Sequence, residues 1–219
     1  MGLRQRFTIN LLATWSNHVL GLLLALILMP KVLGTLGDSL YGTWVFISAF
    51  AGYAGLLSLG MGQTVSRYVA THHAQGDAEQ VNRVVNVIGA VYVVMSGVAM
   101  TIAGVLAWFA PVLWPNCVVS FSELRWVILI LGVNAAVSIT GGVFGGVLVG
   151  LQRIELERAF VLLSGVVRLV LTLTLLHKES GLVTLAIIFL ATTAAEKLGY
   201  VICEFRLVPT LRLDRKSVV

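Results

Sequence analysis

The stretch NAAVSITGGVFGGVLVG, residues 134–150, decides the fold class of this chain. It carries no charged residue, and glycines recur in it at intervals of four, as Gly141 with Gly145, Gly142 with Gly146, and Gly146 with Gly150. Small residues at this spacing share a helix face and let helix backbones approach closely in lipid. The stretch predicts a membrane helix packed tightly against its neighbours, with a flexible gate as the alternative interpretation.

The composition extends this prediction to the whole chain. Of its 219 residues, 58% are hydrophobic and 11% are charged, whereas soluble domains have about 25% charged residues. No polar tract is long enough to surround a separate soluble core, so residues 1–219 are expected to form one all-α integral membrane domain. Cys117 and Cys203 lie far apart, and no pattern of metal ligands or cofactor motif accompanies them.

Six membrane spans are predicted from the apolar runs, each near the length of about 20 residues that crosses a bilayer. They cover residues 8–30, 41–62, 84–109, 126–150, 159–176 and 182–203, and a cytoplasmic tail follows at residues 204–219. Between the second and third spans, residues 66–84 predict a polar helix that ends in a turn at Gly76 and Asp77. The adjacent His72 and His73 do not share a helix face, which favours a solvated surface over a metal site.

The basic residues predict the orientation of the spans. With a cytoplasmic N-terminus, the far side holds only Lys31, Arg125 and Lys178. The cytoplasmic side holds the ten residues Arg4, Arg6, Arg67, Arg83, Arg153, Arg158, Arg206, Arg212, Arg215 and Lys216. This asymmetry follows the positive-inside rule and places both termini in the cytoplasm. The net charge of +5 is therefore explained by the basic residues that set the membrane orientation, and no nucleic-acid partner is expected. Four tryptophans then fall near the outer interface, namely Trp44, Trp108, Trp114 and Trp126.

A polar stripe runs along the first span. Asn10, Thr14, Asn17 and Gly21 recur at intervals of four, three and four residues, with His18 beside them. Polar groups that face lipid would lack hydrogen-bond partners, so the stripe is expected to face protein or water. Polar contacts between helices and the wall of a wet cavity both remain open, and His18 is either a hydrogen-bonded structural residue or a titratable group.

Arg168 lies within the fifth span, where a bilayer penalises charge most. At a rise of 1.5 Å per residue, Arg168 is about 14 Å from the cytoplasmic start of its helix, and Glu196 is about 10 Å from the end of the sixth. The two are expected to form an ion pair, as a purely structural link or as a site for an anionic or ion-coupled substrate; a shifted helix boundary is the third interpretation. Lys197 points about 100° away from Glu196, as a second interior cation or towards the interface.

Motifs for enzymatic chemistry are absent from the sequence. It has no GxxxxGKS phosphate loop, no HExxH and no GxSxG elbow. These absences exclude an ATPase that couples energy within this chain, and they disfavour an enzyme. Ion-driven transport remains the leading expectation, with a membrane scaffold behind it.

Three segments resemble one transporter family. PKVLGTLGDSLYGTW (residues 30–44), YAGLLSLGMGQTVSRYVA (residues 53–70) and GLQRIELE (residues 150–157) are similar, in order and spacing, to the polysaccharide flippase branch of the multidrug and oligosaccharidyl-lipid exporter superfamily. The resemblance covers essentially the whole chain. It implies a multi-pass protein of the bacterial inner membrane that moves an undecaprenyl-pyrophosphate-linked oligosaccharide between leaflets by alternating access, for cell-surface polysaccharides such as O-antigen.

The resemblance also implies partners and a missing part. Relatives have twelve to fourteen helices in two bundles around a cavity, so this chain corresponds to the N-terminal half, which needs a second half or a second copy. A polysaccharide polymerase and glycosyltransferases are further implied partners. Arg168 matches no motif position of the family, and pyrophosphate binding by its guanidinium is a hypothesis from its charge and depth, with Glu196, Lys197, Asn10, Thr14, Asn17 and His18 as further candidate cavity residues. Ser58 stands where many relatives carry Asp, which weakens a cation-coupling role there.

Two other functions stay open from the sequence. The chain is an ion-coupled antiporter for drugs or small solutes in the second hypothesis, although the first four spans have no clear acidic residue for coupling. In the third it is an inactive scaffold in a glycan-assembly complex. The sugar, the coupling ion and the oligomeric state are not specified by the sequence.

Overall fold

The computed structural model describes residues 3–54, 61–115, 119–177 and 181–207. Within these ranges the chain is helical apart from short connections and contains no strand. The helices are α1 (Leu3–Ala54), α2 (Met61–Ala74), α3 (Ala78–Trp108), α4 (Ala110–Leu113), α5 (Phe121–Gly150), α6 (Ile154–Leu175) and α7 (Gly181–Leu207). The all-α class is confirmed.

Within the described residues, five segments are long and apolar enough to cross a membrane: His18–Ala49, Ala78–Trp108, Phe121–Gly150, Ile154–Leu175 and Gly181–Arg206. The last four coincide within a few residues with the third to sixth predicted spans. The chain is therefore a multi-pass helical membrane protein. The predicted tail was to begin at residue 204, but α7 continues to Leu207. Residues 208–219 lie outside the described part.

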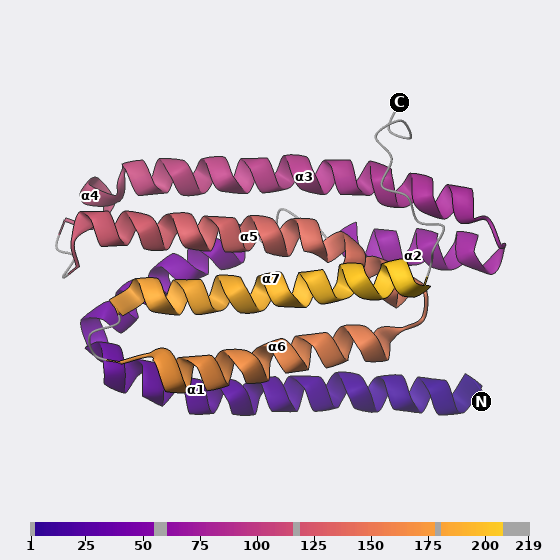
Figure 1. The fold of residues 1–219 in the computed structure, drawn as a ribbon, viewed down its shortest axis with the longest axis horizontal. Helices are drawn as coiled ribbons and strands as arrows, with labels where there is room; N and C mark the ends of the chain where they lie inside the picture. Colours follow the sequence, from indigo (N-terminus) through magenta and orange to yellow (C-terminus); the bar gives the residue numbers. More distant parts are fainter. Residues whose placement is uncertain (1–2, 55–60, 116–118, 178–180, 208–219) are drawn as a thin grey trace.

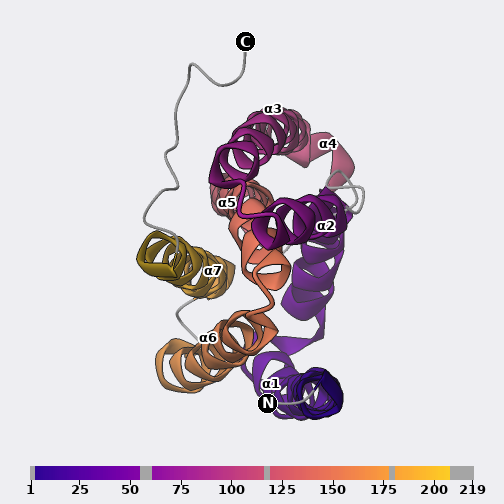
Figure 2. The ribbon, with the colours of Figure 1, turned by 90° about the vertical axis from the view of Figure 1, so that its right-hand side faces the viewer.

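The first two predicted spans, residues 8–30 and 41–62, both overlap α1, which consists of two helical arms joined at a kink. The described residues contain five segments that are long and apolar enough to span a membrane, so the predicted number of six is not confirmed. The connection expected near residues 31–40 is helical and is interrupted at Gly37, which has φ 76° and ψ 168°. This backbone conformation is essentially restricted to glycine. The chain changes direction along α1, and its second arm rises from the level of α6 towards α5 and α2 (Figures 1 and 2). Residues 55–60 of the second predicted span lie outside the described part.

Helix α5 lies at the centre of the bundle and packs against α2, α3 and α7, while α6 packs against α1 and α7 (Figure 2). The glycines of α5 let its neighbours approach closely. A Cβ at Gly150 would lie 2.8 Å from the Ser66 carbonyl oxygen, and a Cβ at Gly146 would lie 3.0 Å from the Gly62 carbonyl oxygen. The prediction of tight packing along residues 134–150 is confirmed.

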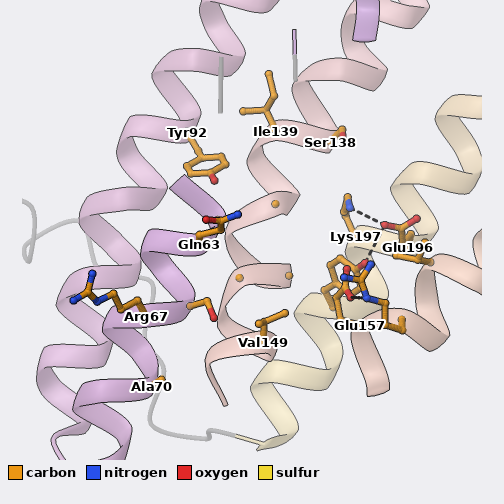
Figure 3. A pocket seen from close by; sticks show the side chains of 18 residues that line it. Gln63, Arg67, Ala70, Tyr92, Ser138, Ile139, Val149, Glu157, Glu196 and Lys197 are labelled. Carbon is orange, nitrogen blue, oxygen red and sulfur yellow. Dashed lines mark hydrogen bonds and ion pairs between the residues drawn. The ribbon is translucent and has the colours of Figure 1, made fainter. Parts of the chain in front are cut away.

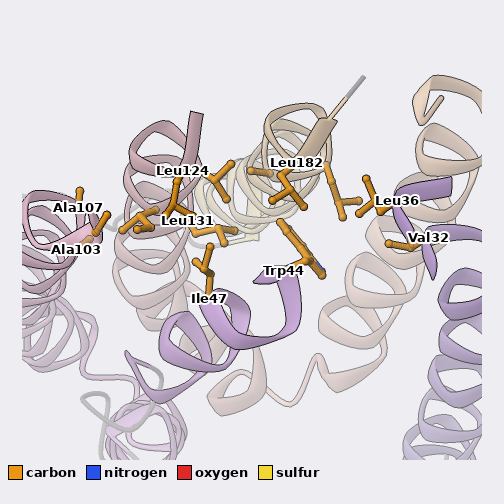
Figure 4. Packing of buried hydrophobic residues seen from close by; sticks show 14 of the residues in the cluster. Val32, Leu36, Trp44, Ile47, Ala103, Ala107, Leu124, Leu131 and Leu182 are labelled. Atoms are coloured by element: carbon orange, nitrogen blue, oxygen red, sulfur yellow. The ribbon is translucent and has the colours of Figure 1, made fainter. Parts of the chain in front are cut away.

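Two hydrophobic clusters hold the opposite ends of the bundle. The first joins α1, α3, α4, α5 and α7 through residues that include Leu36, Trp44, Leu124 and Leu182 (Figure 4). The second joins α2, α3 and α5 around Val65 and Tyr92 and their neighbours. Trp44, which is predicted to lie near the outer interface, is buried between helices, and its indole packs edge-on against Phe189 with ring centroids 5.1 Å apart.

The connection between α2 and α3 follows the predicted turn. Gly76 has φ 74°, and the Asp77 side chain caps α3 by accepting a hydrogen bond of 3.0 Å from the Gln80 backbone N–H. Because a capping carboxylate satisfies a free N–H of the first helical turn, this pair of residues ends α2 and starts α3 within a few positions. The short connection places α2 beside α3 and α5, where it forms one wall of the site.

Candidate functional site

The Arg168 side chain projects from α6 towards α7. Its Nε donates to the Thr192 hydroxyl at 3.0 Å, a terminal nitrogen donates to the Thr193 hydroxyl at 3.3 Å, and the guanidinium carbon lies 4.3 Å from the centroid of the Phe189 ring. Hydroxyls and an aromatic face thus hold this cation within the membrane segment.

The predicted ion pair between Arg168 and Glu196 is not formed among the described residues. Ser164 Oγ donates to Glu196 at 2.6 Å, so Ser164 and Glu196 define the register of α6 against α7. The two helices are antiparallel, so moving one turn along α6 from Ser164 to Arg168 moves one turn back along α7, from Glu196 to Thr192. The prediction was wrong by about one helical turn, or about 5.4 Å.

The Glu196 carboxylate accepts three hydrogen bonds. Besides Ser164, its donors are the Lys197 ammonium at 2.7 Å and the Tyr200 hydroxyl at 3.0 Å. Three donors to one carboxylate stabilise its ionised form inside the bundle. This network ties α6 to α7 and was expected in part, since Glu196 was predicted to face inwards with a cationic partner.

Lys197 is a second interior cation, as one of its two predicted orientations requires. Its ammonium lies 4.8 Å from the centroid of the Tyr200 ring, in addition to its bond to Glu196. The aliphatic stem crosses α5 at Gly141, where any Cβ would overlap it. The glycine at this position therefore allows the lysine to reach the interior.

These side chains border a cavity of about 680 Å³ between α2, α3 and α5 on one side and α6 and α7 on the other (Figure 3). Its lining residues are Gly62, Gln63, Ser66, Arg67, Ala70, Tyr92, Ser138, Ile139, Gly142, Gly145, Gly146, Val149, Glu157, Arg158, Val161, Glu196, Lys197 and Tyr200. Gln63 on α2 points towards the acidic and basic groups of α6 and α7, whereas the guanidinium of Arg67 is turned away from them (Figure 3).

The charges of the cavity are unevenly distributed between its walls. On the α6 and α7 side, Arg158 Nε lies 3.1 Å from a Glu157 oxygen and Lys197 is paired with Glu196. Across the cavity Arg67 is exposed and forms no ion pair with any described residue. The lining therefore has three cations and two carboxylates, with one cation available to an anionic ligand.

The structure brings together only some of the predicted site residues. Glu196 and Lys197 line the cavity, whereas Arg168 is not among the described lining residues. His18 is exposed on α1, also away from that lining. The side chains of Asn10, Thr14 and Asn17 lie outside the described part of the structure, so the polar stripe stays a prediction.

Sequence reasoning did not single out Gln63, Tyr92, Glu157 or Tyr200 as one site, and it placed Arg67 and Arg158 only as cytoplasmic charges. The available signal was the acidic and basic pair Glu157–Arg158 at the very start of an apolar run. Charged residues at a helix end are ordinarily assigned to the membrane interface. That Glu157 and Arg158 border a cavity becomes visible only in the structure, where α2 and α5 form the wall opposite them.

Comparison with protein-family models, with curated proteins and with solved structures found no match for the chain.

Proposed function

We propose that the chain is the N-terminal half of a flippase that carries a lipid-linked oligosaccharide pyrophosphate across the bacterial cytoplasmic membrane. The observation that carries this proposal is the cavity with three cations and two carboxylates inside an apolar bundle. Charges within a membrane segment are costly and usually mark a path for a polar substrate or ion. The sequence resemblance supplies the substrate class.

The position of the cavity fits uptake from the cytoplasmic leaflet. Its cations Arg67 and Arg158 belong to the side on which most basic residues gather, which the positive-inside rule assigns to the cytoplasm. A guanidinium can donate paired hydrogen bonds to a pyrophosphate. In this proposal Arg67 contacts the anionic head group first, and Glu157, Glu196 and the Tyr92 and Tyr200 rings border the sugar.

The contacts of Arg168 argue against a direct role in substrate binding in the described conformation. Its bonds to Thr192 and Thr193 give it a structural role in the described conformation, and substrate contact would require a rearrangement of α6 against α7. The resemblance implies a complete transporter with six more helices, so in this proposal a second half or a second copy of the chain completes the path.

Reversing the charge of one arginine in the cavity lining and of one outside it tests the proposal. Arg67→Glu is expected to lower glycan export at least about tenfold at normal protein level, because each lost charge-assisted contact is worth about 1.5–3 kcal/mol. Arg83→Glu is the matched control, since Arg83 is also exposed on the same side but does not line the cavity. Export is measured as surface glycan in cells that depend on this chain and its second half. Equal export by both variants would contradict the proposal.

The second candidate function is ion-coupled antiport of a small solute. The carboxylates Glu157 and Glu196 in the cavity lining favour it, because coupling ions bind acidic groups near the substrate path. Solute accumulation assays in the same cells separate the two functions: loss of antiport with unchanged surface glycan in Arg67→Glu favours the antiporter. A scaffold would tolerate Arg67→Glu in both assays.

A further inference from the structure

Glu204 is a buried carboxyl group for which the cavity network gives no role. It lies in the last two turns of α7, its residue is 2% exposed, and its Oε1 atom has no hydrogen-bond partner among the described residues. No ion pair in the described part of the chain includes it. By contrast, Glu196 has three donors, and Glu155 and Glu157 each lie beside an arginine.

An ionised carboxylate without donors is strongly disfavoured in a protein interior, and such a group ordinarily becomes neutral by binding a proton. The carboxylic acid loses only the hydrogen bonds of a neutral group, which is a far smaller cost than burying an uncompensated charge. The packing around Glu204 therefore favours its protonated form.

Helix α5 supplies no charge at the level of Glu204. Gly141 contacts Lys197 and Gly145 contacts Tyr200, so α5 and α7 run in the same direction and Glu204 is level with about Val149. The last two turns of α5, residues 143–150, contain no titratable side chain. Tyr200 precedes Glu204 by one turn on α7, and Arg206 is exposed two residues later.

On the α6 side, Phe160 contacts Gly199, which places the first turn of α6 level with Glu204. The titratable groups of that turn are paired with neighbours: Arg158 lies beside Glu157, and Glu155 lies 3.5 Å from Arg153. Neither arginine forms an ion pair with Glu204 in the described structure.

Glu204 also belongs to a line of polar groups that reaches the cavity. Glu196, Tyr200 and Glu204 follow at intervals of four residues and therefore share one face of α7. Tyr200 donates to Glu196, and both line the cavity. Glu204 lies one turn beyond them, at the end of α7 where the predicted cytoplasmic side lies.

We propose that Glu204 is a proton-binding site that senses the separation of α7 from α5 and α6. With this end of the bundle closed, the carboxyl keeps its proton. When the end opens, water reaches the group, its O–H bond breaks, the proton passes to water and a carboxylate remains. High pH thus favours the open end, and the role of this proton as a coupling ion rests on the proposed transport function.

Infrared spectroscopy of the purified chain in lipid nanodiscs tests the proton-binding site itself. At neutral pH the wild type should show the C=O band of a protonated carboxyl, and Glu204→Gln should lack it. Glu155→Gln is the matched control, because Glu155 is exposed and paired with Arg153, and it should keep the band. A spectrum unchanged by Glu204→Gln overturns the proposal, as does a large loss of thermal stability in that variant at neutral pH, which would show that Glu204 is an ionised partner of a cation.

The native thiol of Cys203 reports the opening, since it adjoins Glu204 and is partly exposed. In a Cys117→Ser background, alkylation of Cys203 is compared between wild type and Glu204→Gln at each pH. The ratio of the two rates should rise at least about tenfold from neutral to alkaline pH, within the usual range of coupling between sites. A constant ratio overturns the linkage between proton and opening.

Glycan export separates this inference from the proposed function. If the wild type supports export, Glu204→Gln should lower it and remove its response to collapse of the proton gradient; unchanged export that still responds to the gradient overturns the coupling role. If the wild type supports no export, the proposed function fails, while the infrared and alkylation results still decide whether Glu204 binds a proton.

Discussion

At the scale of single residues, Gly150 shows how little space separates α5 from α2. A Cβ there would lie 2.8 Å from the Ser66 carbonyl oxygen and 2.8 Å from the Val69 Cβ, and backbone atoms cannot move aside as a flexible side chain can. We expect Gly150→Ala to lower the free energy of unfolding by about 1–3 kcal/mol. The measurement is reversible unfolding in mixed micelles.

Gly104 provides the control for that substitution. It is an α3 glycine whose added Cβ would meet no atom within 4 Å, so Gly104→Ala should leave stability unchanged or raise it by up to about 1 kcal/mol through helix propensity. If both alanine variants unfold alike, the close approach of α2 to α5 is not what stabilises this region.

Arg168 allows a test of the contacts that replaced its predicted ion pair. Arg168→Lys keeps the charge but loses the planar group that spans both threonine hydroxyls. A double-mutant cycle with Thr193→Val should give a coupling energy of about 0.6 kcal/mol, the mean for hydrogen bonds between membrane helices. Additive effects of the two substitutions would show that Arg168 and Thr193 do not interact.

The site was predictable from the sequence to the extent that charge in an apolar run identifies an interior residue. Glu196 and Lys197 were found in this way, and both line the cavity. The partner of Arg168 was not found, because hydropathy gives depth only to within about a turn and the register is set by a contact such as Ser164–Glu196. Arg67 and Glu157 were missed as cavity residues because their role depends on which helices become neighbours.

At the scale of helices, α1 depends on a single glycine for its change of direction. The φ of 76° and ψ of 168° at Gly37 lie in a region where any side chain costs about 1–3 kcal/mol. Gly37→Ala should therefore destabilise the protein by that amount, measured as a lower thermal unfolding temperature. Gly34→Ala is the control, since its Cβ also meets nothing within 4 Å and no positive φ is involved; equal effects would contradict the role assigned to Gly37.

Helices α3, α5, α6 and α7 agree closely with the predicted spans because each combines an apolar run with a clear end. Asp77 and Ser120, for example, cap α3 and α5 by accepting bonds from Gln80 and Glu123 backbone N–H groups. The break expected before the second span is different. Its residues Lys31 to Leu40 include good helix formers, so the stretch is helical on both sides of the kink at Gly37, although composition alone assigns it to a connection.

At the scale of the whole molecule, the uneven distribution of basic residues predicts the orientation of the bundle. Single cysteines on opposite ends can test it in a background that lacks Cys117 and Cys203. Ser122→Cys, at the start of α5, should react with a membrane-impermeant thiol reagent on spheroplasts with an intact inner membrane. Thr71→Cys, on α2, should react only after permeabilisation. Both side chains are exposed, so the reverse pattern would mean that the termini lie outside.

The parallel course of α5 and α7 has a consequence for biogenesis. Gly141 of α5 contacts Lys197 of α7, and Gly145 contacts Tyr200. Because α6 lies between these two helices in the sequence, it is synthesised after α5 and before α7. At about 5–20 residues per second, the ribosome needs on the order of several seconds to pass from Gly141 to Lys197. During this interval the glycine-containing surface of α5 around Gly141 and Gly145 has been synthesised but is not yet covered by α7. A nascent chain arrested after α6 should therefore bind an insertase or a quality-control protease at this surface.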